Sequence, residues 1–367
     1  MKKVLFLGLG YIGLPTAAVA ATHGYQVIGV DVNPVVVDTI NQGRIHIVEP
    51  DLAKVVKEAV CNGALRATTK PEQADAFFVV VPTPFKQNHR ADITYVESAT
   101  RSVIPFLKEG DLFVIESTSP VFTTERMAEV IYKERPELKD KLYIAYCPER
   151  VLPGNTLYEL VHNDRVIGGI NPESTGKAIE FYSAFVKGTL HRTNARTAEM
   201  CKLTENSSRD SQIAFANELS MICDKAGVNV WELIELANKH PRVNILQPGP
   251  GVGGHCISVD PWFLVGDYPQ LAKVIDESMK TNDSQPAFVL NRIYEIMEEN
   301  NITDNRKVGL YGLTYKENVD DYRESPALQM LEAQERHLAR PLCCYDPFLE
   351  EHKIAENQYN NFDEFLN

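Results

Sequence analysis

Residues 1–31 read MKKVLFLGLGYIGLPTAAVAATHGYQVIGVD, and this stretch decides the fold. The apolar run Val4–Leu7 lacks the polar–apolar alternation of a half-buried strand, so it predicts a strand buried on both faces. The glycine pattern GLGYIG (8–13) follows at once, before a stretch of helical character. A second apolar run, Gln26–Val30, ends at Asp31. This order of strand, glycine turn, helix and strand predicts a dinucleotide-binding unit.

Each glycine of this turn has an expected task. Gly8 permits the tight turn, Gly10 lets a pyrophosphate approach the backbone, and Gly13 allows the helix to pack closely on the strand. The unpaired N–H groups of the helix N-terminus favour the anion. A carboxylate at Asp31 can bond both ribose hydroxyls, and no Arg or Lys occurs at 32–40 to hold a 2′-phosphate, so we expect NAD rather than NADP. The residues that we expect to bind NAD here are Gly8, Gly10, Tyr11, Ile12, Gly13 and Asp31.

Outward from this turn, apolar runs alternate with helical patterns through the first third of the chain. The further expected strands are Ala76–Val81, Phe113–Glu116 and Leu142–Tyr146. The expected helices are Pro15–His23, Pro34–Gln42, Leu52–Cys61 and Tyr95–Phe106. The alternation predicts an open parallel sheet that binds its ligand at the carboxyl ends of the strands.

The pattern changes beyond about residue 193. Thr197–Lys225 has no Gly or Pro and predicts one long helix, with two more helices expected at Trp231–Asn238 and Leu271–Glu299. Strands at Lys307–Tyr311 and Leu342–Tyr345, with a helix at Pro326–Leu338 between them, predict the start of a second α/β unit. Only two strands precede the last residue, so we expect this unit to be incomplete.

The expected architecture is therefore α/β in three parts. We predict a Rossmann-like NAD-binding domain at 1–192, a helical central domain that dimerises at 193–300, and an incomplete C-terminal α/β domain at 301–367.

The composition argues against several partners. The formal net charge of −13 disfavours nucleic acid and an anionic membrane surface. No run of about 18 apolar residues predicts a transmembrane helix, and glycines interrupt the apolar N-terminus, so we expect neither a membrane span nor a signal peptide. The seven cysteines include no CxxC pair, which is typical of a reducing compartment. We expect a cytoplasmic protein.

The second informative stretch is QPGPGVGGHC (247–256), a loop shaped by its glycines. If Ile257–Phe263 opens a helix, Cys256 lies near a helix N-terminus, which lowers a thiol pKa and activates a nucleophile. An inert buried cysteine is the alternative, and the loop alone does not decide between the two. His255 adjoins Cys256, but with no further Cys/His cluster we predict no metal site.

Other polar residues stand where a ligand is expected. Lys202 and Asn206 are spaced i, i+4 on the long helix and project from one face, although an exposed helical surface explains them too. Loops that follow expected strands contain Pro82-Thr83, Thr118, and Glu149-Arg150. Loops at the ends of parallel strands face the cofactor.

Together these motifs resemble the UDP-glucose/GDP-mannose dehydrogenase family. The matching segments are GLGYIGLP (8–15), IHIVEPDL (45–52), VPTPF (81–85), ESTSP (116–120), AYCPERVLPG (145–154), RTAEMCKLTEN (196–206), HPRVNILQPGPGVGGHCISVDPWF (240–263) and RESPAL (323–328). They span nearly the whole chain in order. The segments 45–52 and 240–250 are similar to the branch that oxidises UDP-N-acetyl-D-mannosamine.

The resemblance implies two successive NAD reductions at one sugar C6, a C-terminal domain that binds UDP, and a homodimer. It implies that Cys256 is the nucleophile and that Lys202, Asn206, Asp260, Glu149 and Thr118 assist it. Further NAD contacts are implied at Pro82, Thr83, Thr118 and Arg323. Implied substrate contacts are Glu149, Arg150, Lys202, Asn206, Arg242, Gly253 and Lys316, with Arg242 reaching the partner subunit's substrate.

Three departures from the family pattern are visible. Phe122 stands where the family commonly has glycine, Ser207-Ser208 replaces a serine and an aromatic residue, and the C-terminal domain normally continues beyond residue 367. UDP-glucose, UDP-N-acetylglucosamine and GDP-mannose remain alternative substrates. A two-electron hydroxyacid or 6-phosphogluconate-type dehydrogenase, which needs no cysteine, and a non-catalytic nucleotide-sugar binder remain alternative functions.

Overall fold

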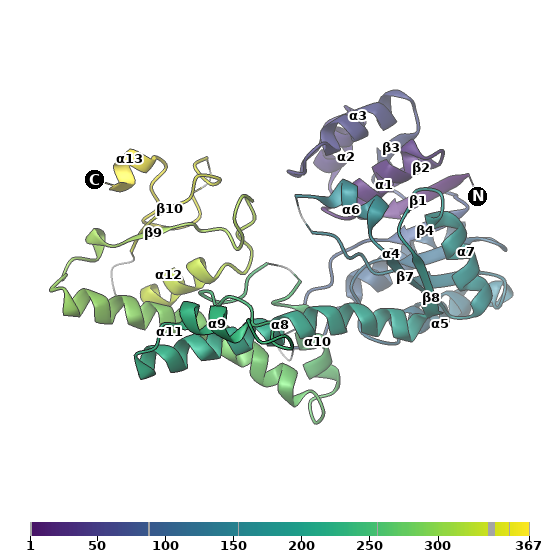
Figure 1. Ribbon diagram of the computed structural model, residues 1–367. Coiled ribbons are helices and arrows are strands. Elements are labelled where there is room, and N and C mark those ends of the chain that lie inside the picture. The colour runs from purple at the N-terminus through teal and green to yellow at the C-terminus, as the bar shows by residue number, and fades with distance from the viewer. Residues whose placement is uncertain are drawn as a thin grey trace. The chain divides into compact units, whose positions relative to one another are not determined.

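The computed structural model describes residues 2–86, 89–152, 154–254, 256–336, 342–351 and 353–366. The chain divides into two compact units, Met1–Leu203 and Thr204–Asn367 (Figure 1, purple to teal and green to yellow). The three domain boundaries expected from the sequence stay predictions.

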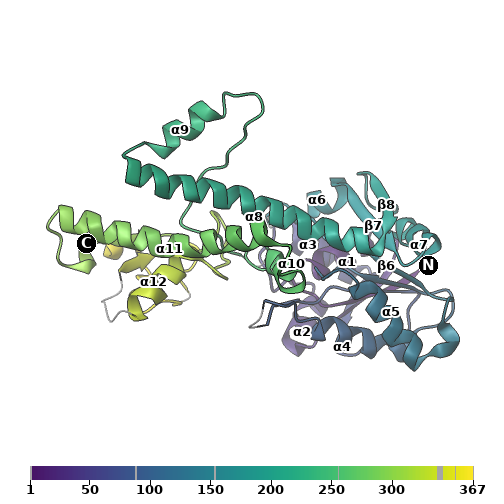
Figure 2. The ribbon, with the colours of Figure 1, turned by 90° about the horizontal axis from the view of Figure 1, so that it is seen from below.

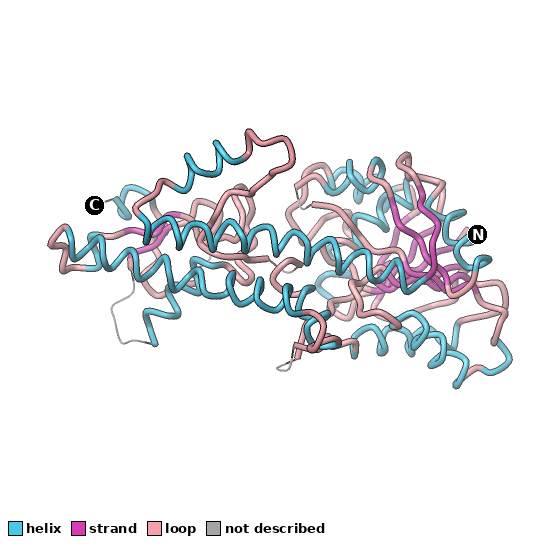
Figure 3. The backbone as a smooth tube through the Cα atoms, turned by 60° about the horizontal axis from the view of Figure 1, so that its bottom comes forward, coloured by secondary structure: helices cyan, strands magenta, loops and turns pink. Residues whose placement is uncertain are grey.

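The N-terminal unit is built on an eight-stranded sheet (Figure 3, magenta). Its strands are β1 (Lys3–Leu7), β2 (Gln26–Val30), β3 (Leu65–Thr68), β4 (Ala76–Val79), β5 (Leu112–Ile115), β6 (Tyr143–Tyr146), β7 (Arg165–Gly169) and β8 (Leu190–Asn194). The order is β3-β2-β1-β4-β5-β6-β7-β8, and all described pairs are parallel except β6 with β7. The expected Rossmann-like fold is confirmed.

Helices cover both faces of this sheet. They are α1 (Gly13–Thr22), α2 (Pro34–Asn41), α3 (Leu52–Cys61), α4 (Thr94–Val103), α5 (Thr123–Glu134), α6 (Thr156–His162) and α7 (Pro172–Tyr182). Along β1, Val4 and Phe6 enter one apolar core while Leu5 and Leu7 enter the other. This two-sided burial explains why the run shows no alternation.

The sequence missed three strands, β3, β7 and β8. Two of them, β3 and β8, are the edge strands of the sheet. An edge strand has one neighbour, so it needs few apolar side chains; β8 reads LHRTN and is largely exposed. The other expected strands and helices of this unit begin and end within two residues of the observed ones, except that the helix expected at Tyr95–Phe106 ends at Val103 and a 3₁₀ turn continues to Phe106.

The start of α5 explains one departure from the family pattern. Phe122 has a φ of 78°, a left-handed conformation that suits glycine. Its N–H donates to Glu199 Oε2 at 2.7 Å, and the Arg196 guanidinium lies 4.7 Å from the centre of its ring. Glu199 Oε1 also accepts from the N–H and the hydroxyl of Thr124, at 2.7 and 2.6 Å. A buried carboxylate on α8 (Ala195–Ala226) therefore caps α5 and holds Phe122 in place.

We expect Glu199→Ala to lower the free energy of unfolding by about 3 kcal/mol, because three donors lose their acceptor inside the protein. Urea denaturation followed by circular dichroism measures this loss. Glu125→Ala is the matched control: its carboxylate pairs with Arg196 on the surface, and the loss is expected to stay under about 1 kcal/mol. Equal losses in the two variants would contradict the capping role.

The C-terminal unit is helical and carries a small sheet. It contains most of α8, then α9 (Val230–Ala237), α10 (Asp260–Asp267), α11 (Lys273–Glu299), α12 (Pro326–Arg336) and α13 (Phe362–Leu366), with β9 (Gly309–Tyr311) parallel to β10 (Cys343–Tyr345). Apolar residues of α11, α12 and the two strands share one core, among them Leu290, Leu331 and Cys344. The long helices and the second, smaller α/β unit are confirmed.

Candidate functional site

The glycine turn between β1 and α1 has the geometry that its sequence predicts. Gly8 has a φ of 93°, and a Cβ there would lie 2.2 Å from the carbonyl oxygen of Val80 on the neighbouring strand segment. A Cβ at Gly13 would lie 1.9 Å from the carbonyl oxygen of Gly8, so only glycine fits. A Cβ at Gly10 would meet no atom within 4 Å. Gly10 is therefore not needed for packing, and it faces open space where a pyrophosphate can approach.

Asp31 is fixed at the end of β2 by the backbone around it. Its Oδ2 accepts the N–H of Leu9 at 3.0 Å, and its Oδ1 accepts the N–H of Asn33 at 2.9 Å. These bonds aim the carboxylate at the glycine turn while leaving lone pairs for ribose hydroxyls. Val32 follows as a fully exposed apolar residue, so no cation stands there to offset a 2′-phosphate.

The next loops meet at the same edge of the sheet, because β4 pairs in parallel with β1 and β5 pairs in parallel with β4. Ser117, which the sequence analysis did not single out, joins them: its Oγ accepts the N–H of Val81 at 2.8 Å. Thr83 is buried and Thr118 half-buried beside this junction. The expected NAD-binding residues of the N-terminal unit thus lie on loops along one edge of its sheet.

Glu149, at the end of β6, is a buried carboxylate with a buried partner. Its Oε2 accepts from Arg165 at 3.0 Å and its Oε1 accepts the N–H of Arg150 at 2.6 Å. Arg165 begins β7, a strand that the sequence did not reveal, so this partner was missed as well. The Arg150 side chain itself donates to the carbonyl oxygen of Asp164 at 3.2 Å. The ion pair keeps Glu149 oriented inside the protein.

Arg165 also organises three more buried groups. Its guanidinium lies 5.0 Å from the ring centre of Tyr182 and 3.8 Å from Cys147 Sγ, and the Tyr182 hydroxyl donates to Glu116 Oε1 at 2.5 Å. Burial raises the pKa of Glu116 to about 7 and the pKa of the Cys147 thiol to about 12. A thiol with that pKa stays protonated near neutral pH, so Cys147 is no nucleophile.

Cys256 lies in the C-terminal unit and is exposed. The helix expected at 257–263 begins three residues later, at Asp260. Cys256 nevertheless leads into it, since its carbonyl oxygen accepts the N–H groups of Val259 and Asp260 at 3.1 and 2.8 Å. The exposed thiol therefore stands on the turn that opens α10, where a nucleophile is accessible.

Asp260 and Asn206, which the family resemblance assigns to one site, lie in contact. Asn206 Nδ2 donates to Asp260 Oδ2 at 2.5 Å, and the Asp260 carboxylate is buried. Lys202 precedes Asn206 by one turn of α8 and belongs to the N-terminal unit. The hydrogen bond from the Asn206 side chain brings Asn206 to Asp260, the first residue of α10. The backbone turn at Cys256 brings the cysteine to the same end of that helix.

The two glycines before Cys256 touch a distant segment. A Cβ at Gly253 would lie 2.6 Å from the carbonyl oxygen of Glu324, and one at Gly254 would lie 2.8 Å from the ring of Tyr315. The N–H of Gly254 also donates to the carbonyl oxygen of Arg323 at 3.0 Å. The glycines are therefore required because residues 315–324 pack on the loop, a reason that the sequence alone did not reveal.

Three further predicted residues lie outside residues 247–256 in sequence: Arg242, Lys316 and Arg323, of which Arg323 reaches the loop through its carbonyl oxygen. Arg323 forms an ion pair with Asp321 at 2.6 Å, and Lys316 accepts a bond from the Thr314 hydroxyl through its carbonyl oxygen at 2.9 Å. Arg242 is exposed in the segment between α9 and α10, apart from the described contacts of Cys256. His255 lies outside the described residues. Within the described ranges, no group of three His, Cys, Asp or Glu residues is arranged to hold a metal ion.

Three family profiles match this chain in order. The profiles describe the UDP-glucose/GDP-mannose dehydrogenase NAD-binding domain at residues 2–186, the central domain at 196–284 and the UDP-binding domain at 309–367. The chain belongs to the UDP-glucose/GDP-mannose dehydrogenase family. It is an NAD-dependent nucleotide-sugar dehydrogenase, as the motifs predicted, and its C-terminal unit includes a UDP-binding domain.

Individual relatives agree with the family profiles. The chain is 57% identical over 339 residues to the UDP-N-acetyl-D-mannosamine dehydrogenase of Escherichia coli, covering 89% of this chain and 81% of the relative. It is 54% identical over 339 residues to the NDP-N-acetyl-D-galactosaminuronic acid dehydrogenase of Ralstonia nicotianae, covering 90% and 79%. A solved UDP-N-acetyl-mannosamine dehydrogenase from Staphylococcus aureus is 43% identical and matches with a TM-score of 0.88, covering 97% of this chain and 84% of that one.

A weaker likeness concerns the two-electron alternative. A 3-hydroxyisobutyrate dehydrogenase from Mycobacterium tuberculosis matches with a TM-score of 0.54 at 15% identity, covering 78% of this chain and 94% of that one. At that identity the likeness shows a shared fold alone. The family membership therefore rests on the nucleotide-sugar dehydrogenases.

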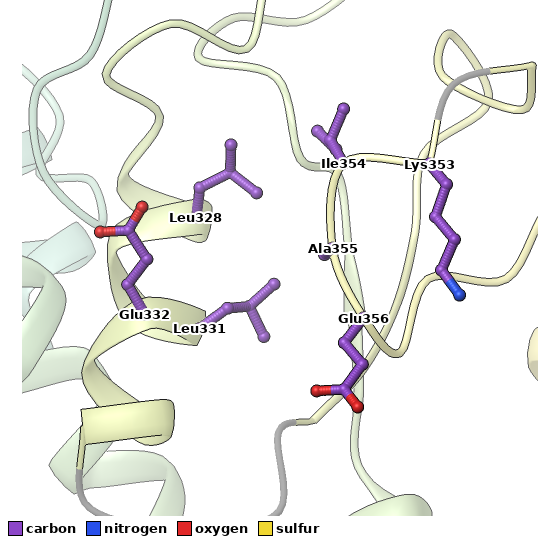
Figure 4. A pocket seen from close by; sticks show the side chains of 7 residues that line it. All are labelled: Leu328, Leu331, Glu332, Lys353, Ile354, Ala355 and Glu356. Carbon is purple, nitrogen blue, oxygen red and sulfur yellow. The ribbon is translucent and has the colours of Figure 1, made fainter.

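One open cavity of about 470 Å³ lies in the C-terminal unit of this dehydrogenase (Figure 4). Its lining residues are Leu328, Leu331, Glu332, Lys353, Ile354, Ala355 and Glu356. The lining contains two glutamates and one lysine, a net negative charge that disfavours a diphosphate. We therefore do not place the nucleotide in this cavity.

Three carboxyls make the stability of this dehydrogenase depend on pH. Burial is the main cause that raises the pKa values of Glu116, Glu199 and Asp210 to about 7. Each folded pKa lies above the unfolded value, so the native state binds more protons between pH about 4 and 7. Their stabilisation is fully present below pH about 4 and is lost as pH rises to about 7. Desolvation lowers the pKa of His46, so this one histidine changes the stability with pH in the opposite direction.

We therefore expect the melting temperature to be higher at pH about 5.5 than at pH about 8. Calorimetry at a series of pH values measures this difference. Asp210→Asn removes one of the three titrations and is expected to flatten the profile. A melting temperature that rises steadily over the same interval would contradict the assignment.

A search of the described residues finds no helix that is long and apolar enough to cross a membrane.

Proposed function

We propose that this dehydrogenase oxidises the C6 hydroxyl of UDP-N-acetyl-D-mannosamine to a carboxylate in the cytoplasm, supplying a uronic acid precursor for surface polysaccharide. The observation that carries the proposal is the exposed Cys256 at the start of α10, with Asp260 bonded to Asn206 beside it. An accessible thiol is what a second oxidation of an aldehyde requires, because a thiohemiacetal has an alkoxide that can expel hydride. The 57% identity to the Escherichia coli enzyme supports the choice of sugar.

The residues carry the following roles in the proposal. Lys202, with Asp260, takes the proton of the C6 hydroxyl in the first oxidation. The Cys256 thiolate then adds to the aldehyde carbon, and the second oxidation leaves a thioester on its sulfur. When bound, NAD would supply the hydride acceptor for each oxidation. Lys202 and Asn206 stabilise the oxyanions, an interaction worth about 3–4 kcal/mol for each donor.

Hydrolysis of the thioester completes the reaction. Water adds to the carbonyl carbon, the C–S bond breaks, and Cys256 leaves as a thiolate. We assign the proton of that water to Glu149, which the Arg165 ion pair keeps oriented. Thr118 assists from the loop that follows β5.

The binding residues follow the same assignment. The proposed NAD contacts are Gly8, Gly10, Tyr11, Ile12, Gly13, Asp31, Pro82, Thr83, Thr118 and Arg323. The proposed substrate contacts are Glu149, Arg150, Lys202, Asn206, Arg242, Gly253 and Lys316. Support comes from the shaped glycine turn at Gly8–Gly13 and from the packing of residues 315–324 on Gly253.

A homodimer is proposed through the central helices. Phe215 and Ile222 lie two turns apart on α8 and are about half exposed, as are Trp231 and Leu236 on α9. Figure 2 shows α9 joined to the end of α8 by a short turn and followed by a long loop. Large apolar side chains exposed on adjoining elements favour a partner surface, and a second copy is the partner that the family resemblance implies.

A panel of sugar nucleotides tests the function. The purified protein is mixed with NAD and UDP-N-acetylmannosamine, UDP-N-acetylgalactosamine, UDP-N-acetylglucosamine, UDP-glucose or GDP-mannose, and NADH and uronate are measured. We expect two NADH per sugar, with the highest kcat/KM for UDP-N-acetylmannosamine. UDP-N-acetylgalactosamine is included because of the Ralstonia relative. One NADH per sugar would favour a two-electron dehydrogenase, and none would favour a binding protein.

A further inference from the structure

A chain of buried amide groups crosses the C-terminal unit between its two long helices. Asp210 and Asn217 lie on α8 and Asn282 lies on α11, and all three are at most 2% exposed. Asn282 Nδ2 donates to Asp210 Oδ1 at 2.6 Å and to the carbonyl oxygen of Asp210 at 3.1 Å. Asn282 Oδ1 accepts from Asn217 Nδ2 at 2.8 Å. Burying three such side chains is costly, so their arrangement calls for a purpose beyond joining the helices.

The chain of buried amide groups ends at the loop that carries Cys256. Asn217 Oδ1 accepts the N–H of Gly249 at 2.9 Å, and Gly249 begins the glycine-rich segment that leads to Cys256. At the other end of this segment the N–H of Gly254 donates to the carbonyl oxygen of Arg323. The loop is thus held at both ends, and the first anchor is a buried side chain.

The direction of every bond in the chain is set by Asp210. Its backbone carbonyl oxygen accepts in either protonation state of the carboxyl, so the amide nitrogen of Asn282 must face it. The oxygen of Asn282 then faces Asn217, which must turn its own nitrogen to Asn282 and its oxygen to Gly249. A reversed Asn282 would place a nitrogen against Asn217, and the Gly249 N–H would meet another donor. The orientation of the Asn217 side chain at the loop therefore depends on Asp210, which is two hydrogen bonds away.

A neighbouring bridge shows what helix packing alone requires. Gln285 on α11 donates to Ser220 Oγ on α8 at 3.0 Å, one turn away from the amide chain. Both residues join the same two helices, and Ser220 Oγ donates in turn to the carbonyl oxygen of Asn217 within α8 at 2.6 Å. The two bridges join the same helices, although the Gln285–Ser220 bond is only partly buried. Of the hydrogen bonds described for the two bridges, only that of Asn217 with Gly249 reaches the loop of Cys256.

We propose that Asn217, oriented by Asn282 and Asp210, is a positioning residue that sets the placement of Cys256 for attack. The inference rests on the proposed function in that Cys256 is taken as the nucleophile. A small displacement of a reacting atom costs rate and leaves substrate binding largely intact, because the near-attack geometry is lost.

The test compares Asn217→Leu with the matched control Gln285→Leu. For Asn217→Leu we expect kcat to fall about 100-fold with KM within about twofold. The alkylation rate of Cys256 by iodoacetamide near neutral pH, mapped by peptide mass spectrometry, is expected to fall about fivefold or more, since the thiol leaves the start of α10. Gln285→Leu is expected to lower the melting temperature while kcat and alkylation stay at wild-type values.

A second variant tests the same role if Asn217→Leu does not fold. If Asn217→Leu fails to fold, Asn282→Ala is measured instead, with the same direction and roughly a tenfold loss of kcat expected. Wild-type kcat and alkylation in the folded variant would falsify the proposal, and so would equal losses in Gln285→Leu. If the wild-type protein reduces no NAD with any sugar nucleotide, the proposed function fails, and the alkylation rates still decide the placement of Cys256.

Discussion

Replacing Cys256 by alanine should abolish uronate formation, with a loss of roughly 10⁴-fold or more. Without the thiol no thiohemiacetal forms, so the second hydride has no alkoxide to expel it. Cys256→Ser should accumulate a slowly hydrolysed ester on the protein, because an alkoxide is a poorer leaving group than a thiolate. NADH per sugar and the mass of the intact protein measure both effects.

The control for this prediction is Cys61→Ser. Cys61 is another exposed cysteine, located at the end of α3, and its replacement should leave turnover unchanged. The buried Cys147 is unsuited as a replacement nucleophile, since its pKa of about 12 keeps it protonated. Two NADH per sugar from Cys256→Ala would overturn the covalent mechanism.

The second large effect concerns the glycine turn of the NAD site. Gly13→Ala should lose both NAD binding and stability, because its Cβ would stand 1.9 Å from the carbonyl oxygen of Gly8. Gly10→Ala should keep its melting temperature, since nothing lies within 4 Å of the added methyl. It should still lose at least about tenfold in NAD affinity, or about 1.4 kcal/mol, because the methyl occupies the space that the pyrophosphate approaches.

Calorimetric titration with NAD and thermal melting separate these two variants. Gly176→Ala serves as the control, because this glycine lies within α7 and an added Cβ would come no closer than 3.5 Å to Arg192. It should leave NAD binding unchanged and raise stability slightly, as alanine favours a helix. If Gly10→Ala bound NAD as the wild type does, the pyrophosphate would have to lie elsewhere.

The local backbone geometry of the proposed NAD site was predictable from sequence. Gly8, Gly13 and Asp31 lie on one short strand–helix–strand unit, and their roles follow from backbone geometry within that unit. The same holds for Lys202 and Asn206, whose spacing alone places them one helical turn apart. The loop sequence allows two interpretations of Cys256, a nucleophile or an inert buried cysteine. Its exposure and its place before α10 favour the nucleophile.

The long-range side-chain partners of Glu149 and of the start of α5 were not predictable from the sequence. Arg165 pairs with Glu149 across β6 and β7, and Glu199 reaches the start of α5 from another helix. Neither pair has a periodic or local sequence signal, because its members are joined by sheet order and helix packing. The edge strands were missed for a similar reason: hydrogen bonding to a neighbour, rather than apolar character, makes β8 a strand.

The sequence by itself determined the Rossmann-like class, the preference for NAD and the residues of the glycine turn. These depend on chain geometry within a few residues, where glycine, carboxylate and helix N-terminus act on one another directly. Only the tertiary structure decided that Cys147 is inert while Cys256 is exposed, and that Asn217 anchors the loop before Cys256. Burial and long-range hydrogen bonds set those properties, and both arise only when distant segments pack together.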